Sequence, residues 1–382
     1  MRILIDARLY GLENAGLGRY VMNLVRHLSE LDPKNEYVIL LRKNYFNRLK
    51  LPERWTAVKS DFRHYGVLEQ ILLPLIIMKH KPDLVHFPHF NIPLLCPKPF
   101  VVTIHDILMH KQKGLDATTL PAFLYYFKRL GYGVVFRRAV MASRVVIVPS
   151  NFVKKEIADY YKVAPEKIKV TYEGLDEAIS LKGSVSNVLK NYKVEMPYFI
   201  YSGNAYPHKN LKRLIEATLE LNQMAKEKSS LLIISARNVF TKRLTELVKK
   251  MRVGSLVKLL GFVSDHDLAV LYNKSEAFIF PSISEGFGLP GLEAMATGTL
   301  ALVSDIPVFR EVYKGAATYF NPYDFSSMAR AMKDVLEMDK GERRERVERG
   351  QEFVKRYSWR KMAEETLEIY GQTISKPVLK TR

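Results

Sequence analysis

The sequence contains a single cysteine, Cys96, and therefore cannot form an internal disulfide or a metal site built from several cysteines. Low cysteine usage is typical of proteins in a reducing compartment, so we expect this protein in the cytoplasm. The first residues, MRILIDARLYG, predict a strand and lack the apolar run and cleavage site of a secretory signal.

No hydrophobic run is long enough to span a bilayer. The nearest candidate, ILLPLIIM at 71–78, is too short and contains Pro74. The sequence therefore predicts a protein that is soluble or bound to a membrane surface, including the inner face of the cell membrane.

Acidic residues are scarce relative to basic ones, and the net charge is +19. Residues 1–175 hold 27 Lys and Arg against 15 Asp and Glu, which leaves a net +7 for the remainder. Such charge favours anionic partners, namely nucleic acid, acidic lipids or phosphorylated substrates, although a merely solubilising surface explains it equally well.

The 382 residues predict two globular domains. Short β-rich runs alternate with amphipathic stretches, as in parallel sheets covered by helices. In the first half, strands are expected at 2–6, 37–41, 83–87, 100–104 and 144–148, and helices at about 17–30, 67–79, 117–142 and 151–161.

The alternation breaks at 170–197, which we interpret as a linker. It then resumes with strands expected at 198–202, 231–235, 257–260, 277–281, 299–304 and 317–320. The sequence thus predicts an α/β protein with two Rossmann-like, doubly wound domains facing across a cleft. Ligands of such sheets bind beyond the carboxyl ends of strands, so residues that follow each strand are candidates for a site.

The segment SEGFGLPGLEAMATG, 284–298, places Glu285 in a glycine-rich bend and Glu293 near the start of a helix expected at 290–297. Eight residues along one helix span about 12 Å, too far for the carboxylate pair of a retaining glycosidase. The glycines can instead let backbone N–H groups approach a sugar attached to a phosphate. The alternative is that Glu293 only complements the helix dipole and the glycines only form a turn.

Further motifs occur in order along the chain: GLGRY (16–20), PDLVHFPH (82–89), TIHD (103–106), VPSNF (148–152), GNAYPHKN (203–210) and YSWRKMAEETLEIY (357–370). Together with the two glutamates, which have seven residues between them, this series resembles the retaining glycosyltransferase family 4 (group 1) over nearly the whole chain. The resemblance implies the GT-B fold. It implies an N-terminal acceptor-side domain at 1–175, a donor-binding domain at 195–357, and a last helix at about 358–382 that packs back on the first domain, with Trp359 as an anchor.

By this resemblance, Lys209 is the lysine that binds the donor diphosphate. The expected donor-binding residues are Gly16, Gly18, Gly203, Lys209, Asn210, Glu285, Gly286, Phe287, Gly288, Leu289 and Glu293. Many members carry an arginine shortly after the glycine that corresponds to Gly203, but the segment 204–208 has none, so His208 or another group would have to assist Lys209. The alternative is a solvated lysine at a helix start.

His105 and Asp106 follow the strand expected at 100–104. The resemblance makes His105, with Glu285 and Lys209, a catalytic candidate that binds or polarises the transferred sugar, and places Asp106 on the acceptor side. A buried structural histidine is the alternative. His86 and His89 lack the further ligands of a metal site, and no metal cofactor is expected.

Aromatic and basic residues alternate at 123–141, and together with 69–81 they could rest on an anionic membrane. The same stripes would suit helices that face the core with basic outer faces, which is the interpretation the sequence favours. No module that reads or stacks on nucleic acid bases is recognisable, so no nucleic acid partner is expected.

The resemblance implies a retaining glycosyltransferase that moves a hexose from GDP-mannose or a UDP-hexose. Mannose is favoured because the segment GNAYPHKN resembles that of enzymes that use GDP-mannose. The acceptor is expected to be a glycan or a lipid-linked glycan in cell-envelope polysaccharide biosynthesis. The alternatives are a GT-B nucleotide-sugar epimerase or glycan phosphorylase, and a non-catalytic basic protein that binds membrane or nucleic acid.

Overall fold

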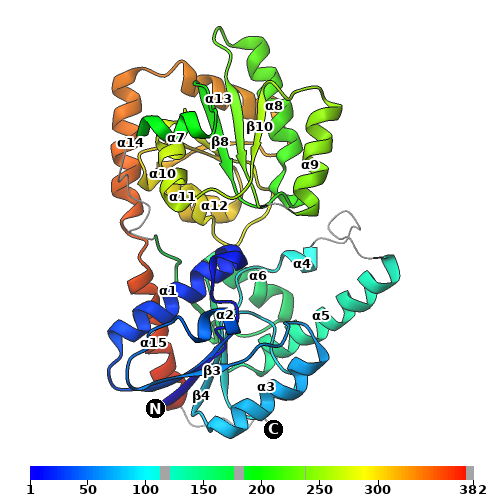
Figure 1. Ribbon diagram of the computed structural model, residues 1–382, viewed down its shortest axis with the longest axis vertical. Helices are drawn as coiled ribbons and strands as arrows, with labels where there is room; N and C mark the ends of the chain where they lie inside the picture. Colours follow the sequence, from blue (N-terminus) through cyan, green and yellow to red (C-terminus); the bar gives the residue numbers. More distant parts are fainter. Residues whose placement is uncertain (112–120, 176–184, 237, 376–382) are drawn as a thin grey trace. The chain divides into compact units, whose positions relative to one another are not determined.

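The computed structural model describes residues 1–111, 121–175, 185–236 and 238–375. They divide into two compact α/β units, each with a parallel sheet and covering helices (Figure 1). The N-terminal unit consists of described residues 1–111, 121–174 and 358–375, and the C-terminal unit consists of 175 and 185–357.

The N-terminal sheet has the strand order β3-β2-β1-β4-β5-β6-β7. Its strands are β1 (Arg2–Ile5), β2 (Glu36–Leu41), β3 (Trp55–Lys59), β4 (Leu84–Phe87), β5 (Phe100–Thr103), β6 (Val145–Val148) and β7 (Ile168–Val170). The five predicted strands are confirmed. The two that the sequence did not predict, β3 and β7, are the edge strands, which are partly exposed or very short and therefore lack a strong apolar run.

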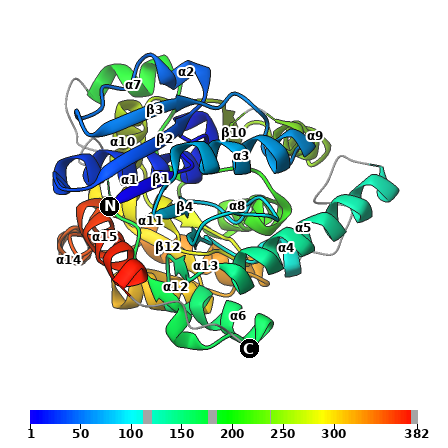
Figure 2. The ribbon, with the colours of Figure 1, turned by 90° about the horizontal axis from the view of Figure 1, so that it is seen from below.

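The helices of this unit are α1 (Ala15–Leu31), α2 (Lys43–Phe46), α3 (Val67–His80), α4 (Leu108–Lys111), α5 (Ala122–Ala142), α6 (Asn151–Tyr161) and α15 (Trp359–Ser375). Side chains of α3, α5 and α6, among them Leu73, Phe136 and Ile157, join one core on a single face of the sheet. Figure 2 shows α1 and α15 together on the opposite side. The first residues of the helix predicted at 117–142 lie outside the described part of the chain. No helix of the described residues is long and apolar enough to cross a bilayer.

Helix α15 is joined to the N-terminal sheet by a buried polar network. The two ring nitrogens of His86 on β4 lie 2.5 Å from the Tyr370 hydroxyl of α15 and 2.9 Å from the Thr103 hydroxyl of β5. Thr103 also lies 3.1 Å from the hydroxyl of Tyr20 on α1. The buried Trp359 ring packs against Tyr20. These contacts explain why the last helix belongs to the first unit.

Acid should weaken this network, because burial lowers the pKa of His86 to about 3. An unfolded histidine has a pKa of about 6.5, so between these values only the unfolded state binds the proton. The stability contributed by a neutral His86 is therefore fully present above about pH 6.5 and is lost at about 1.4 kcal/mol per pH unit as the pH falls toward 3.

We expect the free energy of unfolding to fall less steeply between pH 6 and pH 4 in His86→Gln than in the wild type. The difference should be about 1.4 kcal/mol per pH unit, because the unfolded variant has one fewer imidazole to protonate. Urea unfolding followed by tryptophan fluorescence measures this in the relevant unit, because Trp55 and Trp359 both belong to it. Equal slopes for the variant and the wild type would show that His86 is not held neutral.

The C-terminal sheet has the strand order β10-β9-β8-β11-β12-β13. The strands are β8 (Tyr198–Ser202), β9 (Ser230–Ile234), β10 (Val257–Leu260), β11 (Phe278–Phe280), β12 (Ala301–Ser304) and β13 (Thr318–Phe320), and all six had been predicted. The helices are α7 (Val185–Asn191), α8 (Leu211–Met224), α9 (Val239–Lys250), α10 (Asp265–Lys274), α11 (Leu289–Ala296), α12 (Pro307–Tyr313), α13 (Phe325–Leu336) and α14 (Lys340–Val354).

The interpretation of 170–197 as a linker is wrong at residue 170 and at 185–191. Residue 170 closes β7, and Val185–Asn191 forms α7, while 176–184 lie outside the described residues. Helix α7 packs against α10, and Tyr192 donates a hydrogen bond to Asp267 (2.9 Å) just after α7 ends. So short a helix is stabilised by tertiary packing rather than by its own sequence, which is why it shows no clear period.

Candidate functional site

The carboxyl ends of β8 and β11 mark the point where the C-terminal sheet changes direction. The two strands are neighbours, and the chain leads from β8 outward to β9 on one side and from β11 to β12 on the other. Open α/β sheets bind ligands at such a switch point. The loop after β8 carries Lys209, and the loop after β11 carries Glu285.

Lys209 and Glu285 form an ion pair between Nζ and Oε1. Their side chains are only 11% and 12% exposed, so the pair has lost much of its hydration. The ammonium also lies 5.5 Å from the centre of the Phe280 ring at the end of β11. The structure therefore brings together two of the three residues that were predicted to be catalytic.

Asn210 fixes the loop that carries Lys209. Its backbone is left-handed, with φ of 60°, and its side-chain amide donates to the carbonyls of Pro281 (3.1 Å) and Pro322 (2.7 Å). The amide oxygen accepts from Arg213. Because these contacts occupy the amide, they indicate a positioning role for this predicted donor-binding residue.

Gly203, which directly follows β8, has a φ of 145°. A Cβ atom there would lie 2.8 Å from the Tyr201 hydroxyl, which donates a hydrogen bond to the Asn204 carbonyl (2.7 Å). Only glycine fits this turn without strain.

The helix predicted at 290–297 is confirmed as α11, and Gly298 ends it with a φ of 85°. Gly288 has a φ of 116°, and its carbonyl accepts a hydrogen bond from the Tyr313 hydroxyl of α12. A Cβ atom on Gly291 would lie 2.3 Å from the same hydroxyl. Close packing of α11 on α12 therefore explains these two glycines without a ligand.

The other predicted residues of this segment, Gly286, Phe287, Leu289 and Glu293, are buried. Phe287 packs its ring edge-on against Tyr357. The carboxylate of Glu293 lies in α11 as predicted, and a carboxylate at this depth requires polar partners.

Two buried polar atoms beside the ion pair have no hydrogen-bond partner among the described residues: Ser282 Oγ and His208 Nδ1. Their loops adjoin, because the Ile283 amide donates to the His208 carbonyl (2.9 Å). Burial lowers the pKa of His208 to about 4, so the ring is neutral at pH 7. Such atoms are those that a bound ligand would satisfy. Sequence reasoning missed Ser282, although its place directly after a strand was a signal.

In the N-terminal unit, His105 lies between two acceptors. Its Nδ1 is 3.1 Å from the Glu173 carboxylate and its Nε2 is 3.1 Å from the Pro88 carbonyl. The two contacts involve both ring nitrogens, so the ring is held in one orientation between Glu173 and Pro88. The ring also packs edge-on against Tyr20. Glu173 follows β7 and had been assigned to the linker, so the sequence analysis did not connect it with His105.

Asp106 turns the chain into α4. Its carboxylate accepts a hydrogen bond from the Leu108 amide (2.8 Å) at the start of that helix. Among the described residues, no group of three or more His, Cys, Asp or Glu side chains is placed to hold a metal ion.

Comparison with known proteins identifies the family. Residues 15–178 match the family described as Glycosyltransferase Family 4, and residues 189–353 match the one described as Glycosyl transferases group 1. The O-antigen chain mannosyltransferase RfbU of Salmonella typhimurium is 30% identical over 295 residues, which cover 76% of this chain and 74% of that protein. The chain belongs to the family 4 (group 1) glycosyltransferases.

Two further comparisons extend over almost the whole glycosyltransferase. The O-antigen chain mannosyltransferase B of Escherichia coli is 24% identical over 376 residues, covering 93% of this chain and 95% of that protein. The structure of Anabaena Alr3699/HepE in complex with UDP and glucose has a TM-score of 0.75 at 17% identity, covering 97% of this chain and all of that one. The predicted GT-B fold is thereby confirmed.

The two glycines at the start of α1 differ in what surrounds them in the glycosyltransferase. A Cβ atom on Gly18 would lie 1.8 Å from the backbone carbonyl oxygen of Gly11, whereas one on Gly16 would meet nothing within 4 Å. Packing therefore requires glycine at position 18 and not at position 16.

Substitutions at the two positions can therefore distinguish a glycine that is needed for folding from one that is needed for donor binding. We expect Gly18→Ala to lower the melting temperature, whereas Gly16→Ala should leave it unchanged or raise it, because alanine favours a helix. If Gly16 is there so that the donor can approach the backbone, Gly16→Ala should raise KM for the donor while the fold stays intact. A Gly16→Ala variant with unchanged kinetics would remove Gly16 from the donor site.

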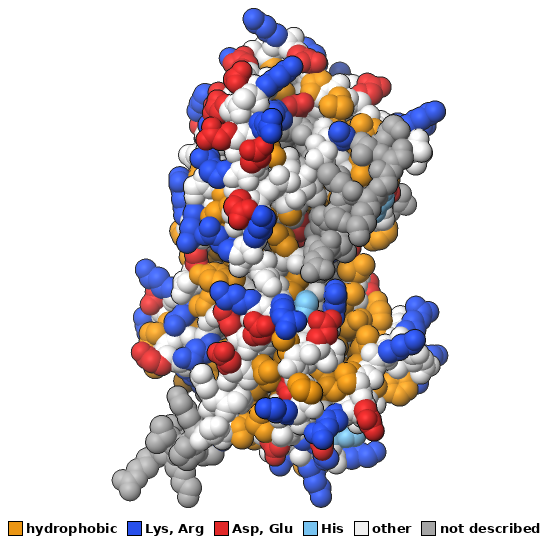
Figure 3. Space-filling model, turned by 90° about the vertical axis from the view of Figure 1, so that its left-hand side faces the viewer, with side chains coloured by type: hydrophobic (Ala, Val, Ile, Leu, Met, Phe, Trp, Pro, Cys, Tyr) orange, Lys and Arg blue, Asp and Glu red, His pale blue; other side chains and the backbone are white. Residues whose placement is uncertain are grey.

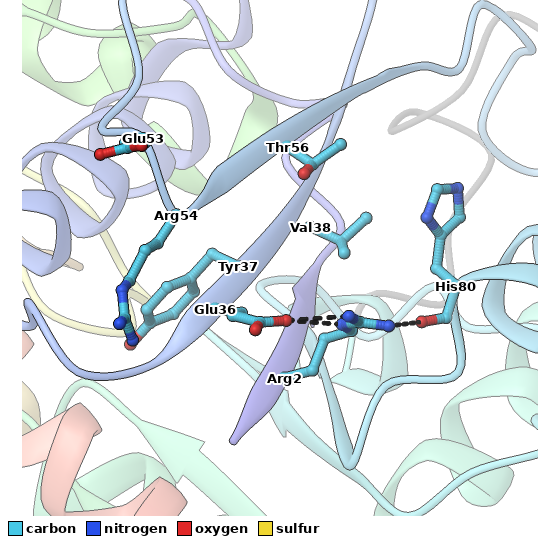
Figure 4. A pocket seen from close by; sticks show the side chains of 8 residues that line it. All are labelled: Arg2, Glu36, Tyr37, Val38, Glu53, Arg54, Thr56 and His80. Atoms are coloured by element: carbon cyan, nitrogen blue, oxygen red, sulfur yellow. Dashed lines mark hydrogen bonds and ion pairs between the residues drawn. The ribbon is translucent and has the colours of Figure 1, made fainter.

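A hollow of about 570 Å³ lies at the opposite, amino-terminal end of the N-terminal sheet (Figure 4). Arg2 pairs there with Glu36 (2.9 Å) and donates to the His80 carbonyl (3.3 Å). These two charged groups are paired within the protein. The hollow lies at the other end of the N-terminal sheet from the loop that carries His105 and Asp106.

Proposed function

We propose that this glycosyltransferase moves mannose from GDP-mannose, with retained anomeric configuration, to a glycan or lipid-linked glycan of a cell-envelope polysaccharide, at the cytoplasmic face of the cell membrane. The observation that carries the proposal is the partly buried Lys209–Glu285 pair at the switch point of the C-terminal sheet. Two relatives named as O-antigen mannosyltransferases support the choice of mannose.

In the proposed complex, the donor diphosphate replaces Glu285 as the partner of Lys209. The ammonium then contacts phosphate oxygens, and the released carboxylate accepts hydrogen bonds from the hydroxyls of the sugar. Ser282 Oγ and His208 Nδ1, which have no partner among the described residues, are further candidates for donor contacts.

The remaining donor contacts are assigned to the backbone and to one buried acid. The loops at Gly203 and Gly286–Leu289 and the start of α11 supply N–H groups, and Glu293 accepts from the ribose. Asn210 holds these loops together through Pro281 and Pro322. Gly16 and Gly18, at the start of α1, are assigned to the part of the N-terminal unit that approaches the donor.

The reaction breaks the bond between the sugar C1 and the phosphate oxygen and forms a bond between C1 and the acceptor oxygen. Negative charge develops on the departing diphosphate, and Lys209 stabilises it. The departing phosphate oxygen takes the acceptor proton, so that no protein nucleophile is needed. No metal is assigned to the reaction.

The acceptor side is assigned to Asp106 of the N-terminal unit, and His105, which also follows β5, is assigned to binding or polarising the transferred sugar. Both nitrogens of His105 are held by Glu173 and Pro88, so a sugar hydroxyl binds either in exchange for one of these acceptors or against the ring edge.

A panel of nucleotide sugars tests the proposal. GDP-mannose at a hundred times its dissociation constant should stabilise the protein by about 2.7 kcal/mol, and UDP-glucose and UDP-N-acetylglucosamine should not. Incubation with labelled GDP-mannose and an acceptor glycan should release GDP in step with labelled product. Stabilisation by a UDP-sugar alone would overturn the choice of donor. Donor isomers formed without acceptor would indicate an epimerase.

A further inference from the structure

Helices α3 and α5 are apolar on both of their long faces. Their inner faces confirm the prediction that they face the core, with Leu73, Ile77 and Phe136 fully buried. Their outer faces were expected to be basic, but they carry large exposed apolar side chains as well. These are Val67, Leu68, Ile71, Leu72, Leu75 and Met78 on α3, and Phe123, Leu124, Tyr126, Phe127, Leu130, Val134 and Met141 on α5.

The two outer faces form one continuous surface, because the loop at 91–99 is bonded to both helices. The Leu94 amide donates to Gln70 of α3 (2.8 Å), and Arg138 of α5 donates to the Leu94 carbonyl (3.1 Å). Leu95 in this loop is 80% exposed. We call the outer faces of α3 and α5, with Leu94 and Leu95, the docking face.

Exposed charge on the docking face has one sign. Helix α5 contains no acidic residue, and it exposes Lys128, Arg137 and Arg138. The one carboxylate of α3, Glu69, is buried and paired with Arg8. Figure 3 shows the left-hand side of the view in Figure 1, away from α5, where Asp and Glu in red lie among Lys and Arg in blue.

We propose that the docking face binds the surface of a bilayer that contains anionic lipids. Exposed apolar surface of this extent marks an interaction site in a soluble fold. An apolar face that also carries positive charge suits the boundary between acyl chains and acidic headgroups. Phe123, Tyr126 and Phe127, close together at the start of α5, are residues typical of that boundary.

A bilayer fits better than a second copy of the chain, because a copy would place like charges opposite one another unless it contributed acids, and this face exposes none. The role of the face rests on the proposed function, since docking brings the enzyme to a lipid-linked acceptor. Binding itself can be measured without a donor, so the two proposals can fail separately.

The test is co-sedimentation of the full chain with vesicles. Vesicles rich in phosphatidylglycerol should bind the protein, and vesicles of phosphatidylcholine alone should bind it much more weakly. Phe123→Ser with Phe127→Ser should weaken binding at least tenfold, and Lys128→Gln with Arg137→Gln should weaken it about fivefold per charge removed.

Phe262→Ser is the matched control, because Phe262 is an 81% exposed aromatic residue of the C-terminal unit. It should leave vesicle binding unchanged, and all variants should keep the wild-type melting temperature and transfer to a lipid-free glycan. Absence of vesicle binding, or equal binding by the Phe123 and Phe127 variant, would overturn the proposal. Sedimentation velocity would reveal the competing case, a dimer that this variant dissociates.

Discussion

Replacing Glu285 with glutamine is expected to lower kcat by about 10²- to 10³-fold, the range found when one group that stabilises a transition state is removed. Glutamine keeps the size of the side chain but loses the negative charge. Because Glu285 no longer competes for the Lys209 ammonium, the dissociation constant of GDP-mannose should stay the same or fall. Steady-state rates and calorimetric titration with GDP-mannose measure the two quantities separately.

Lys209→Met should have the complementary effect, raising the dissociation constant of GDP-mannose as well as lowering kcat, because the cation for the diphosphate is lost. The matched control is Lys212→Met on the same stretch of chain. Lys212 is 68% exposed and pairs with Glu216 one turn along α8, so the rate and affinity should not change. A Glu285→Gln enzyme with the wild-type rate would refute the site assignment.

Replacing His105 with alanine is expected to lower kcat by about 10²-fold or more, within the range of positioned acid–base and polar groups. The ring is held on both nitrogens and packs against Tyr20, so its position is fixed by contacts within one unit. Some loss of melting temperature should accompany the loss of rate, because the side chain is only 13% exposed and alanine removes these contacts. Initial rates with saturating donor measure it.

Glu173→Gln tests whether this carboxylate acts through His105. Glutamine can still accept a hydrogen bond from Nδ1, so we expect an intermediate, roughly tenfold, loss of kcat with little change in donor KM. The control is Glu166→Gln, an exposed glutamate just before β7. If Glu173→Gln and Glu166→Gln behave alike, Glu173 does not position the imidazole.

Strong apolar runs made most of the fold predictable. The central strands of both sheets, such as Ile3 to Ile5 and Phe199 to Tyr201, are buried on both faces, so their composition alone identifies them. The edge strands β3 and β7 and the short helix α7 depend on neighbours for their stability. Their sequences therefore carried too little signal.

Candidate site residues could be predicted from the sequence where a side chain of suitable chemistry lay in the loop after a predicted strand. Lys209 and Glu285 met that condition, and the structure joins them in one ion pair. Which groups share a contact was not predictable when they are far apart in sequence, as for His105 and Glu173. The reason for the glycines at 288 and 291 also lies in α12, because Phe309 and Tyr313 occupy the space that side chains there would need.

The most direct test is a crystal structure of the full chain with GDP-mannose. We predict that the diphosphate contacts the Lys209 ammonium and that the Glu285 carboxylate has left it for the hydroxyls of the sugar. A nucleotide bound away from the carboxyl ends of β8 and β11, with the Lys209–Glu285 pair intact, would contradict the account.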